Sequence, residues 1–265
     1  MASESLSDLR EFAAELAWQA GKLTLRYFQT DFRTEFKADQ SPVTVADRQA
    51  ERLMRELIEA RYPQHSILGE EEGETRPGAA FRWILDPIDG TANFARRIPY
   101  WCVSIGVYAD GDAVGGVIHN PMAGETHAAA RGRGATLNGK PIRVSQATSP
   151  EHSRIGLGFS YRRERHLHVA AIDRLLARQC EYSRLGSGAL GMAHVADGRF
   201  EGYFEPHINS WDVAAGLVIV REAGGFTNDF FARDGLTRGN PILAGAPGLR
   251  EFLERTLGDL MEPGT

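Results

Sequence analysis

The stretch that most constrains this chain is residues 83–94, which read Trp-Ile-Leu-Asp-Pro-Ile-Asp-Gly-Thr-Ala-Asn-Phe. An apolar run ends at Asp86, and a proline and a glycine, both of which break regular structure, lie on either side of a second acid, Asp89. This pattern predicts a buried strand that ends at Asp86, then a turn, and then a short helix that begins near Thr91.

The residue types in this turn point to a particular chemistry. Two carboxylates three residues apart at a strand end can converge on one point, and hard divalent cations prefer oxygen ligands. Backbone N–H groups at a helix start, here those of Gly90 and Thr91, suit a phosphate. The alternative is an ordinary turn with local Asp hydrogen bonds. That alternative is weakened because Asp86 follows Trp-Ile-Leu, and an ionised carboxylate against the core needs a cation or several donors.

Composition excludes several classes of function. The formal net charge of -5 argues against a general nucleic-acid or membrane-surface binder, which normally carries a basic excess. The sequence contains no run of about 18 apolar residues, so no membrane span is predicted. Charged residues close to the first methionine argue against a signal peptide. The two cysteines, Cys102 and Cys180, are expected to be buried thiols. We therefore expect a cytoplasmic protein.

The chain is expected to contain two halves that differ in pattern. Residues 1–147 predict two amphipathic helices, then a short strand, a polar loop over residues 74–80 and an antiparallel meander with hairpin turns. In residues 148–265 strands alternate with helices, which indicates a layered α/β half. The halves are expected to form one compact unit with the active site between them.

Four acids stand where regular structure is predicted to begin or end: Glu70, Asp86, Asp89 and Asp212. Each has a structural alternative. Asp212 could be a helix N-cap, and Glu70 could belong to a solvated acidic loop. A fifth acid, Asp47, lies three residues after a threonine in a pattern close to a capping box.

Three segments together resemble one known family. Residues 69–71 (Gly-Glu-Glu), 83–94 and 211–216 (Trp-Asp-Val-Ala-Ala-Gly) resemble the inositol monophosphatase family of Mg²⁺-dependent phosphatases, in the right order and spacing. The resemblance implies an α/β fold, an alternating α-β-α-β-α sandwich with an antiparallel sheet in the first half and a mixed sheet in the second. It also implies a small-molecule phosphate monoester as substrate, a homodimer, and inhibition by Li⁺ and Ca²⁺.

The resemblance further implies a set of metal ligands. Glu70, Asp86 and the backbone carbonyl of Ile88 would hold a first Mg²⁺. Asp86 would bridge to a second ion, which Asp89 and Asp212 would also hold. Family members often take a third, weaker ion near Glu70, so two to three Mg²⁺ are expected.

The catalytic roles implied by the resemblance fall on the same turn. Thr91 and Asp47 would form a hydrogen-bonded pair that helps to activate the attacking water, together with Glu70. Gly90 and Thr91 would bind the phosphate through backbone N–H groups. The chemistry agrees, because metal ions can neutralise a phosphate monoester and no covalent nucleophile is required.

Substrate contacts are expected further along the chain. Glu205 lies six residues before Trp211, where the family places an acid that binds substrate hydroxyls. Gly186, Ser187 and Gly188 match another substrate-contacting turn, and Lys37 matches a basic residue on a loop over the metals. Glu205 could equally be a surface acid and Lys37 a solvated lysine.

The substrate is left with alternatives. The arrangement around Glu205 and Trp211 favours inositol-1-phosphate, whereas residues 37–48 and 65–71 also look like histidinol-phosphate phosphatases of the same superfamily. A different class is an accessory factor for transcription or RNA processing, with a protein contact through the basic cluster at residues 162–168. That cluster is otherwise expected to be a solvated helix start.

Overall fold

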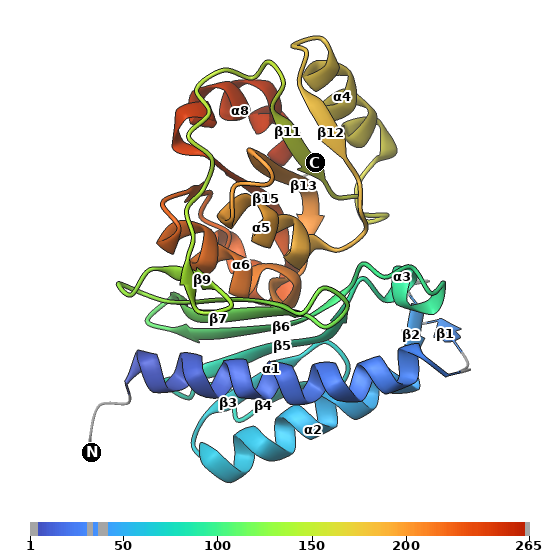
Figure 1. The fold of residues 1–265 in the computed structure, drawn as a ribbon, viewed down its shortest axis with the longest axis vertical. Coiled ribbons are helices and arrows are strands. Elements are labelled where there is room, and N and C mark those ends of the chain that lie inside the picture. Colours follow the sequence, from blue (N-terminus) through green and yellow to red (C-terminus); the bar gives the residue numbers. More distant parts are fainter. Residues whose placement is uncertain (1–4, 31–33, 37–41, 263–265) are drawn as a thin grey trace.

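The computed structural model describes residues 5–30, 34–36 and 42–262. Five layers succeed one another (Figure 1): helices α1 and α2, an eight-stranded sheet, helices α5 and α6, a five-stranded sheet, and helices α4 and α8. The predicted α/β layered sandwich is therefore confirmed. Among the residues that the structure describes, no helix combines the length and the hydropathy needed to cross a membrane.

The first layer consists of two amphipathic helices, as their sequence spacing predicts. Helix α1 (Leu6–Phe28) buries one stripe of small and aliphatic residues at helical spacing. Helix α2 (Val45–Arg61) begins at a capping box, in which the backbone N–H of Thr44 donates to Asp47 Oδ2 at 2.8 Å. The capping alternative for Asp47 is thus confirmed at the level of local structure.

The eight-stranded sheet has the order β10-β9-β8-β7-β6-β5-β3-β4. Its neighbouring strands run antiparallel except β3 and β5, so the predicted antiparallel sheet of the first half is wrong for this one pair. These two strands run parallel because β4 turns back along the outer edge of β3. The predicted loop over residues 74–80 is wrong at its start, since β4 occupies that position; its exposed, polar residues show no apolar alternation. The strands are β3 (Ser66–Gly69), β4 (Gly73–Thr75), β5 (Arg82–Asp89), β6 (Cys102–Ala109), β7 (Asp112–Asn120), β8 (Glu125–Ala130), β9 (Ala135–Leu137) and β10 (Lys140–Pro141).

The five-stranded sheet has the order β12-β11-β13-β15-β14 and is mixed, as predicted. Strand β11 runs parallel to β12 and β13, and β15 runs antiparallel to β13 and β14. Its strands are β11 (Arg154–Leu157), β12 (Glu181–Ser183), β13 (Gly202–Ile208), β14 (Phe226–Thr227) and β15 (Asn240–Gly245). The helices of this half are α4 (Arg165–Leu176), α5 (Gly188–Ala196), α6 (Ser210–Glu222), α7 (Gly235–Arg238) and α8 (Arg250–Leu257).

The remaining elements are small. A two-stranded ribbon of β1 (Thr34–Phe36) and β2 (Pro42–Thr44) precedes α2, and the short helix α3 (Thr91–Ala95) begins where the sequence predicts. Three 3₁₀ turns complete the chain, η1 (Ala232–Asp234), η2 (Pro247–Leu249) and η3 (Gly258–Met261). We keep the division at residue 147 as a proposal about domain organisation.

The largest apolar core lies around α5 and α6, which are buried between the two sheets. Both helices are apolar around most of their circumference because each contacts a sheet on either side. The start of α6 is held against the eight-stranded sheet, where Ser104 Oγ on β6 donates to the carbonyl of Trp211 at 3.2 Å. This packing brings Asp212 next to the end of β5.

Candidate active site

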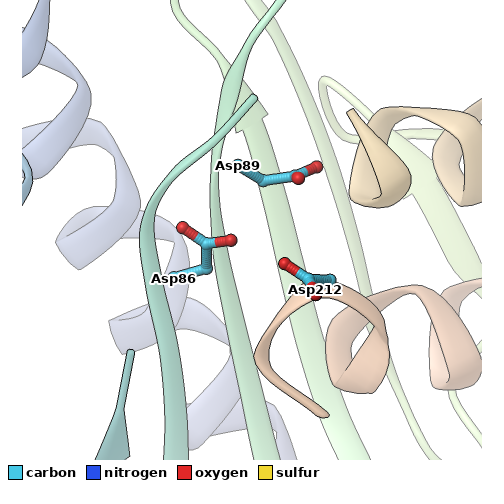
Figure 2. Close-up of side chains that lie close together, drawn as sticks. All are labelled: Asp86, Asp89 and Asp212. Atoms are coloured by element: carbon cyan, nitrogen blue, oxygen red, sulfur yellow. The ribbon is translucent and has the colours of Figure 1, made fainter. Parts of the chain in front are cut away.

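Three carboxylates from two distant parts of the chain meet at the end of β5. Asp86 and Asp89 come from β5 and Asp212 from the first turn of α6, and one oxygen of each lies within 4.8 Å of the others. Figure 2 shows the three side chains bordering one space between the strand and the helix. The expectation that these acids converge is met by the geometry.

The electrostatics of this cluster favour a cation. Burial raises the pKa of Asp86 well above its usual range, and the negative charges of Glu70, Asp89 and Asp212 raise it further. Burial likewise raises the pKa of Asp212, with added repulsion from Asp89 and Glu70. An ion with a double positive charge would remove this repulsion, and the all-oxygen donor set suits a hard cation.

Glu70 lies beside this cluster at the end of β3. Its backbone N–H donates to the carbonyl of Leu85 at 3.1 Å, which fixes its position against β5. Its charge raises the pKa of Asp86, Asp212 and Asp47. Among the described residues, the group whose carboxylate oxygens lie within 4.8 Å of one another contains Asp86, Asp89 and Asp212 but not Glu70. Glu70 therefore borders the cluster from one side.

Asp89 is held by the beginning of α5. Ser187 Oγ donates to its Oδ2 at 2.5 Å, and the N–H groups of Ala189 and Gly188 donate at 2.7 and 3.3 Å. Burial raises the pKa of Asp89, while these donors act in the opposite direction. Ser187 and Gly188 therefore direct polar groups at a carboxylate of the cluster, and their predicted contact with substrate stays a prediction.

A threonine–aspartate pair adjoins the cluster. Thr91 Oγ1 lies 3.4 Å from Asp47 Oδ1 and 2.9 Å from the carbonyl oxygen of Ile88. The other oxygen of Asp47 accepts from the backbone N–H and hydroxyl of Thr44, at 2.8 and 2.5 Å. Burial raises the pKa of Asp47 to about 7, and the charge of Glu70 adds to this. Capping the helix and contacting Thr91 therefore use different oxygens of one side chain.

The turn between β5 and α3 has a strained backbone that only glycine adopts readily. Gly90 has φ of 98°, in the left-handed region, and directs the chain so that α3 begins at Thr91. Asn93 amide Nδ2 donates to the carbonyls of Tyr100 and Leu185, both at 2.8 Å. Sequence reasoning missed this role of Asn93, which ties the turn to the segment before α5.

A cleft of about 240 Å³ extends from Asp89 and Asp212 toward β13. Glu205 lies in its wall, buried, and accepts a hydrogen bond from Tyr203 Oη at 2.8 Å. Burial raises the pKa of Glu205 to about 8, although the positive charge of Arg184 opposes the shift. The surface-acid alternative for Glu205 is therefore wrong.

The sequence also carries a signal for Tyr203, which the motifs alone do not indicate. Residues two apart on a strand face the same side, so Tyr203 and Glu205 of β13 share a face. Gly186, Ser187 and Gly188 also line the cleft, as their predicted place in the substrate site requires. Lys37 lies outside the described residues.

The basic cluster at residues 162–168 is divided by the structure. Helix α4 begins only at Arg165, so Arg162 precedes it and lines the cleft instead. Arg162 Nη1 donates to Asn209 Oδ1 at 2.6 Å, next to the start of α6. Arg162 is exposed, as expected of a solvated residue, but it precedes the helix instead of forming its start.

Comparison with known proteins agrees with this geometry. A sequence profile of the inositol monophosphatase family matches residues 5–261. The chain belongs to the inositol monophosphatase family. The resemblance inferred from its motifs is confirmed, and the chain is a phosphatase of that family.

Two curated members of the family show how its names divide. The chain is 36% identical over 240 residues to the "Nus factor SuhB" of Escherichia coli, which covers 89% of this chain and 90% of that protein. It is 35% identical over 265 residues to the inositol-1-monophosphatase of Rhizobium meliloti, covering 95% of this chain and 98% of the relative.

A solved family structure has the same fold. The inositol monophosphatase from Anabaena (Nostoc) superposes with a TM-score of 0.84 at 35% sequence identity, over 96% of both chains. Both curated members and this structure match nearly the whole chain, so the matched region spans the segments that carry the acids and the cleft.

Proposed function

We propose that this protein is a Mg²⁺-dependent phosphatase that hydrolyses inositol-1-phosphate to myo-inositol and phosphate. The observation that carries the proposal is the convergence of Asp86, Asp89 and Asp212 within 4.8 Å, the first two buried and Asp212 half-buried. A threonine–aspartate pair on one side and a polar cleft on the other complete the arrangement.

In the proposed metal centre, Glu70, Asp86 and the carbonyl of Ile88 would hold one ion, and Asp86, Asp89 and Asp212 would hold another. The Thr91 hydroxyl has one hydrogen, and in this proposal it points to Asp47 rather than to the carbonyl of Ile88, which leaves that carbonyl free to serve a metal. When bound, Mg²⁺ neutralises phosphate charge and lowers the pKa of a bound water. A third ion near Glu70 remains part of the proposal.

The protein residues then position and deprotonate the nucleophile. The Thr91 hydroxyl orients the attacking water, and Asp47 can take a proton through it, since a pKa of about 7 suits a general base at neutral pH. The N–H groups of Gly90 and Thr91, at the start of α3, bind the phosphate oxygens. Attack in line with the leaving alkoxide needs no covalent intermediate.

The far end of the cleft supports a neutral, hydroxyl-rich leaving group. Glu205 can accept from or donate to hydroxyls, because its pKa of about 8 allows both protonation states near neutral pH. The guanidinium groups of Arg184 and Arg162 line the same cleft. Their positive charge disfavours histidinol phosphate, whose alcohol carries an ammonium group, so this substrate is the less favoured alternative.

A phosphate-release panel with Mg²⁺ tests the proposal. We expect the highest kcat/KM for inositol-1-phosphate, with histidinol phosphate and glycerol phosphate lower. A higher value for histidinol phosphate would overturn the substrate, and no release from any monoester at millimolar Mg²⁺ would overturn the enzymatic proposal. Ca²⁺ and Li⁺ are expected to inhibit.

A second candidate role is that of an accessory factor in transcription or RNA processing. It is favoured by the likeness to a protein named a Nus factor. An RNA polymerase pulldown with the Asp86→Asn variant separates the two roles, because an adaptor would retain binding without turnover. The net charge of -5 argues for a protein contact rather than a nucleic-acid contact.

The remaining expectations stay proposals about the protein in the cell. We propose a cytoplasmic homodimer. Sedimentation equilibrium of the purified protein measures the oligomer directly, and a monomer at micromolar concentration would overturn that part.

A further inference from the structure

Helix α2 carries a buried acid that the proposed chemistry does not use. Glu51 lies one helical turn after Asp47, on the same face, and its side chain is 0% exposed. A buried carboxylate requires donors or a partner charge. Its surroundings therefore show what it does.

The donors come from the turn that follows β3. The N–H of Glu71 donates to Glu51 Oε2 at 2.8 Å, and the N–H of Glu72 donates to Glu51 Oε1 at 3.0 Å. Arg55 Nε donates to the same Oε1 at 2.8 Å. Glu51 thus binds the two backbone N–H groups immediately after Glu70.

Arg55 completes the connection from the same helix. Its Nη2 donates to the carbonyl of Gly73 at 2.5 Å, and its Nε lies 3.7 Å from Glu72 Oε2. The Arg55 side chain is 7% exposed, so solvent only weakly screens its ion pair with the buried Glu51. The backbone of the turn is therefore held by Glu51 at its start and by Arg55 at its end.

The fit between Glu51 and this segment is close. A Cβ added at Gly69 would lie 2.2 Å from Glu51 Oε1. Glycine before Glu70 therefore leaves room for the carboxylate to reach the N–H groups beyond it. Three independent features, a buried acid, two aligned N–H groups and a missing side chain, converge on one turn.

We propose that Glu51, supported by Arg55, is a positioning residue for the metal centre: it fixes the backbone of residues 70–72 so that the Glu70 carboxylate faces the Asp86–Asp89–Asp212 cluster. This inference rests on the proposed metal centre. It assigns helix α2 two tasks, because Asp47 contacts Thr91 while Glu51 orients the strand end that carries Glu70.

The test is Mg²⁺ binding to the Glu51→Gln variant by calorimetry, without substrate. The amide places an NH₂ group against a backbone N–H, which breaks one of the two turn bonds while keeping the size. Residues that orient metal ligands typically change affinity by about 10–100-fold, and we expect a rise of about 10-fold in Kd. The matched control is Glu56→Gln, on the exposed side of α2, whose Kd should equal that of the wild type.

A double-mutant cycle shows whether the effect passes through Glu70. In a Glu70→Gln background, Glu51→Gln should raise Kd little further, because the oriented ligand is already lost. Hydrogen exchange of the metal-free protein gives a second readout. The Glu71 and Glu72 amides should exchange faster in Glu51→Gln than in the wild type, and equal exchange would overturn the proposal.

The outcomes separate this inference from the proposed function. A wild type that binds no Mg²⁺ overturns the metal centre itself. A wild type that binds Mg²⁺ and a Glu51→Gln variant that folds and binds equally well overturn only the role of Glu51. If Glu51→Gln does not fold, Arg55→Lys decides by the same titration, with a raised Kd expected and an unchanged Kd contradicting the proposal.

Discussion

The two ends of the cleft are built differently. At the metal end, Asp86 and Asp89 lie in a strand inside a fully packed sheet, and Asp212 lies at the start of a buried helix. At the other end, Arg162 and Arg184 are exposed, whereas Glu205 is buried. We therefore expect substitutions at the packed metal end to affect every substrate, and substitutions at the more exposed distal end to affect the choice of leaving alcohol.

The largest effect should come from the centre of the metal end. Asp86→Asn removes the charge that the proposal shares between two ions, and the loss of several kcal/mol of transition-state stabilisation lowers kcat/KM by about 10³-fold or more. Phosphate release from inositol-1-phosphate measures it. The exposed Asp110→Asn variant is the control, and turnover near that of the control would contradict the metal assignment.

Asp212 tests whether capping and catalysis can be separated. The expected N-cap alternative is wrong in detail: Asn209 is the N-cap, and Asp212 is the third helical residue, accepting from the Asn209 N–H at 3.0 Å. In Asp212→Asn the amide oxygen can keep this bond, so stability should change by less than about 1 kcal/mol. Activity should still fall, by about 10²-fold. If stability measured by thermal unfolding and activity measured by turnover fell together, Asp212 would have a structural role.

The distal end should give a smaller and substrate-dependent effect. Glu205→Ala is expected to raise KM for inositol-1-phosphate by about 10-fold, as for the loss of one hydrogen bond to a charged group. KM for a small artificial ester should change little, because that ester does not reach β13. Tyr203→Phe, which removes only the donor to Glu205, should give a weaker effect in the same direction. Equal effects on both substrates would remove Glu205 from the substrate site.

This contrast also explains what the sequence could predict. The metal end is encoded locally: an apolar run, two acids and a helix start place Asp86, Asp89 and Thr91 within nine residues. The predicted strand end at Asp86 is wrong, because β5 continues through an irregularity to Asp89. Periodicity predicted the helices, the meander and a layered α/β second half, whereas the order of the five layers came from the family resemblance. The partners Glu70, Asp47 and Asp212 had to be supplied by the family resemblance, because nothing local says that β3, α2 and α6 bring them to the end of β5.

The distal end and the support behind Glu70 depend on tertiary packing. Arg162 borders the cleft because the loop between β11 and α4 carries it to Asn209, next to the start of α6. Glu51 looked like an ordinary polar residue of an amphipathic helix, yet it is buried because the β3 end passes over it. Strand β4 was missed because pairing with β3, rather than any apolar alternation, makes it a strand.

The smallest effect concerns the stability of the metal-free protein. Burial raises the pKa of Asp47 from 3.8 to about 7 and that of Glu205 to about 8, and raises those of Asp86 and Asp212 well above their usual range. When folding raises the pKa of an acid, the acid contributes its full stabilisation at a pH below its pKa in the unfolded chain. This contribution is lost as the pH rises through its pKa in the folded protein.

Without metal, Tm should therefore fall as pH rises from about 4 to about 8. Each kcal/mol lost lowers Tm by about 2–4 °C in a domain close to this size. Mg²⁺ should reduce this fall in Tm, because it neutralises the carboxylates of the metal end. Part of the fall should persist, because Mg²⁺ does not neutralise Glu205. In Asp86→Asn the metal-free decline should be shallower than in the wild type. Calorimetric scans with and without Mg²⁺ measure both, and a Tm that rises over this pH range without metal would contradict the electrostatic account of the cluster.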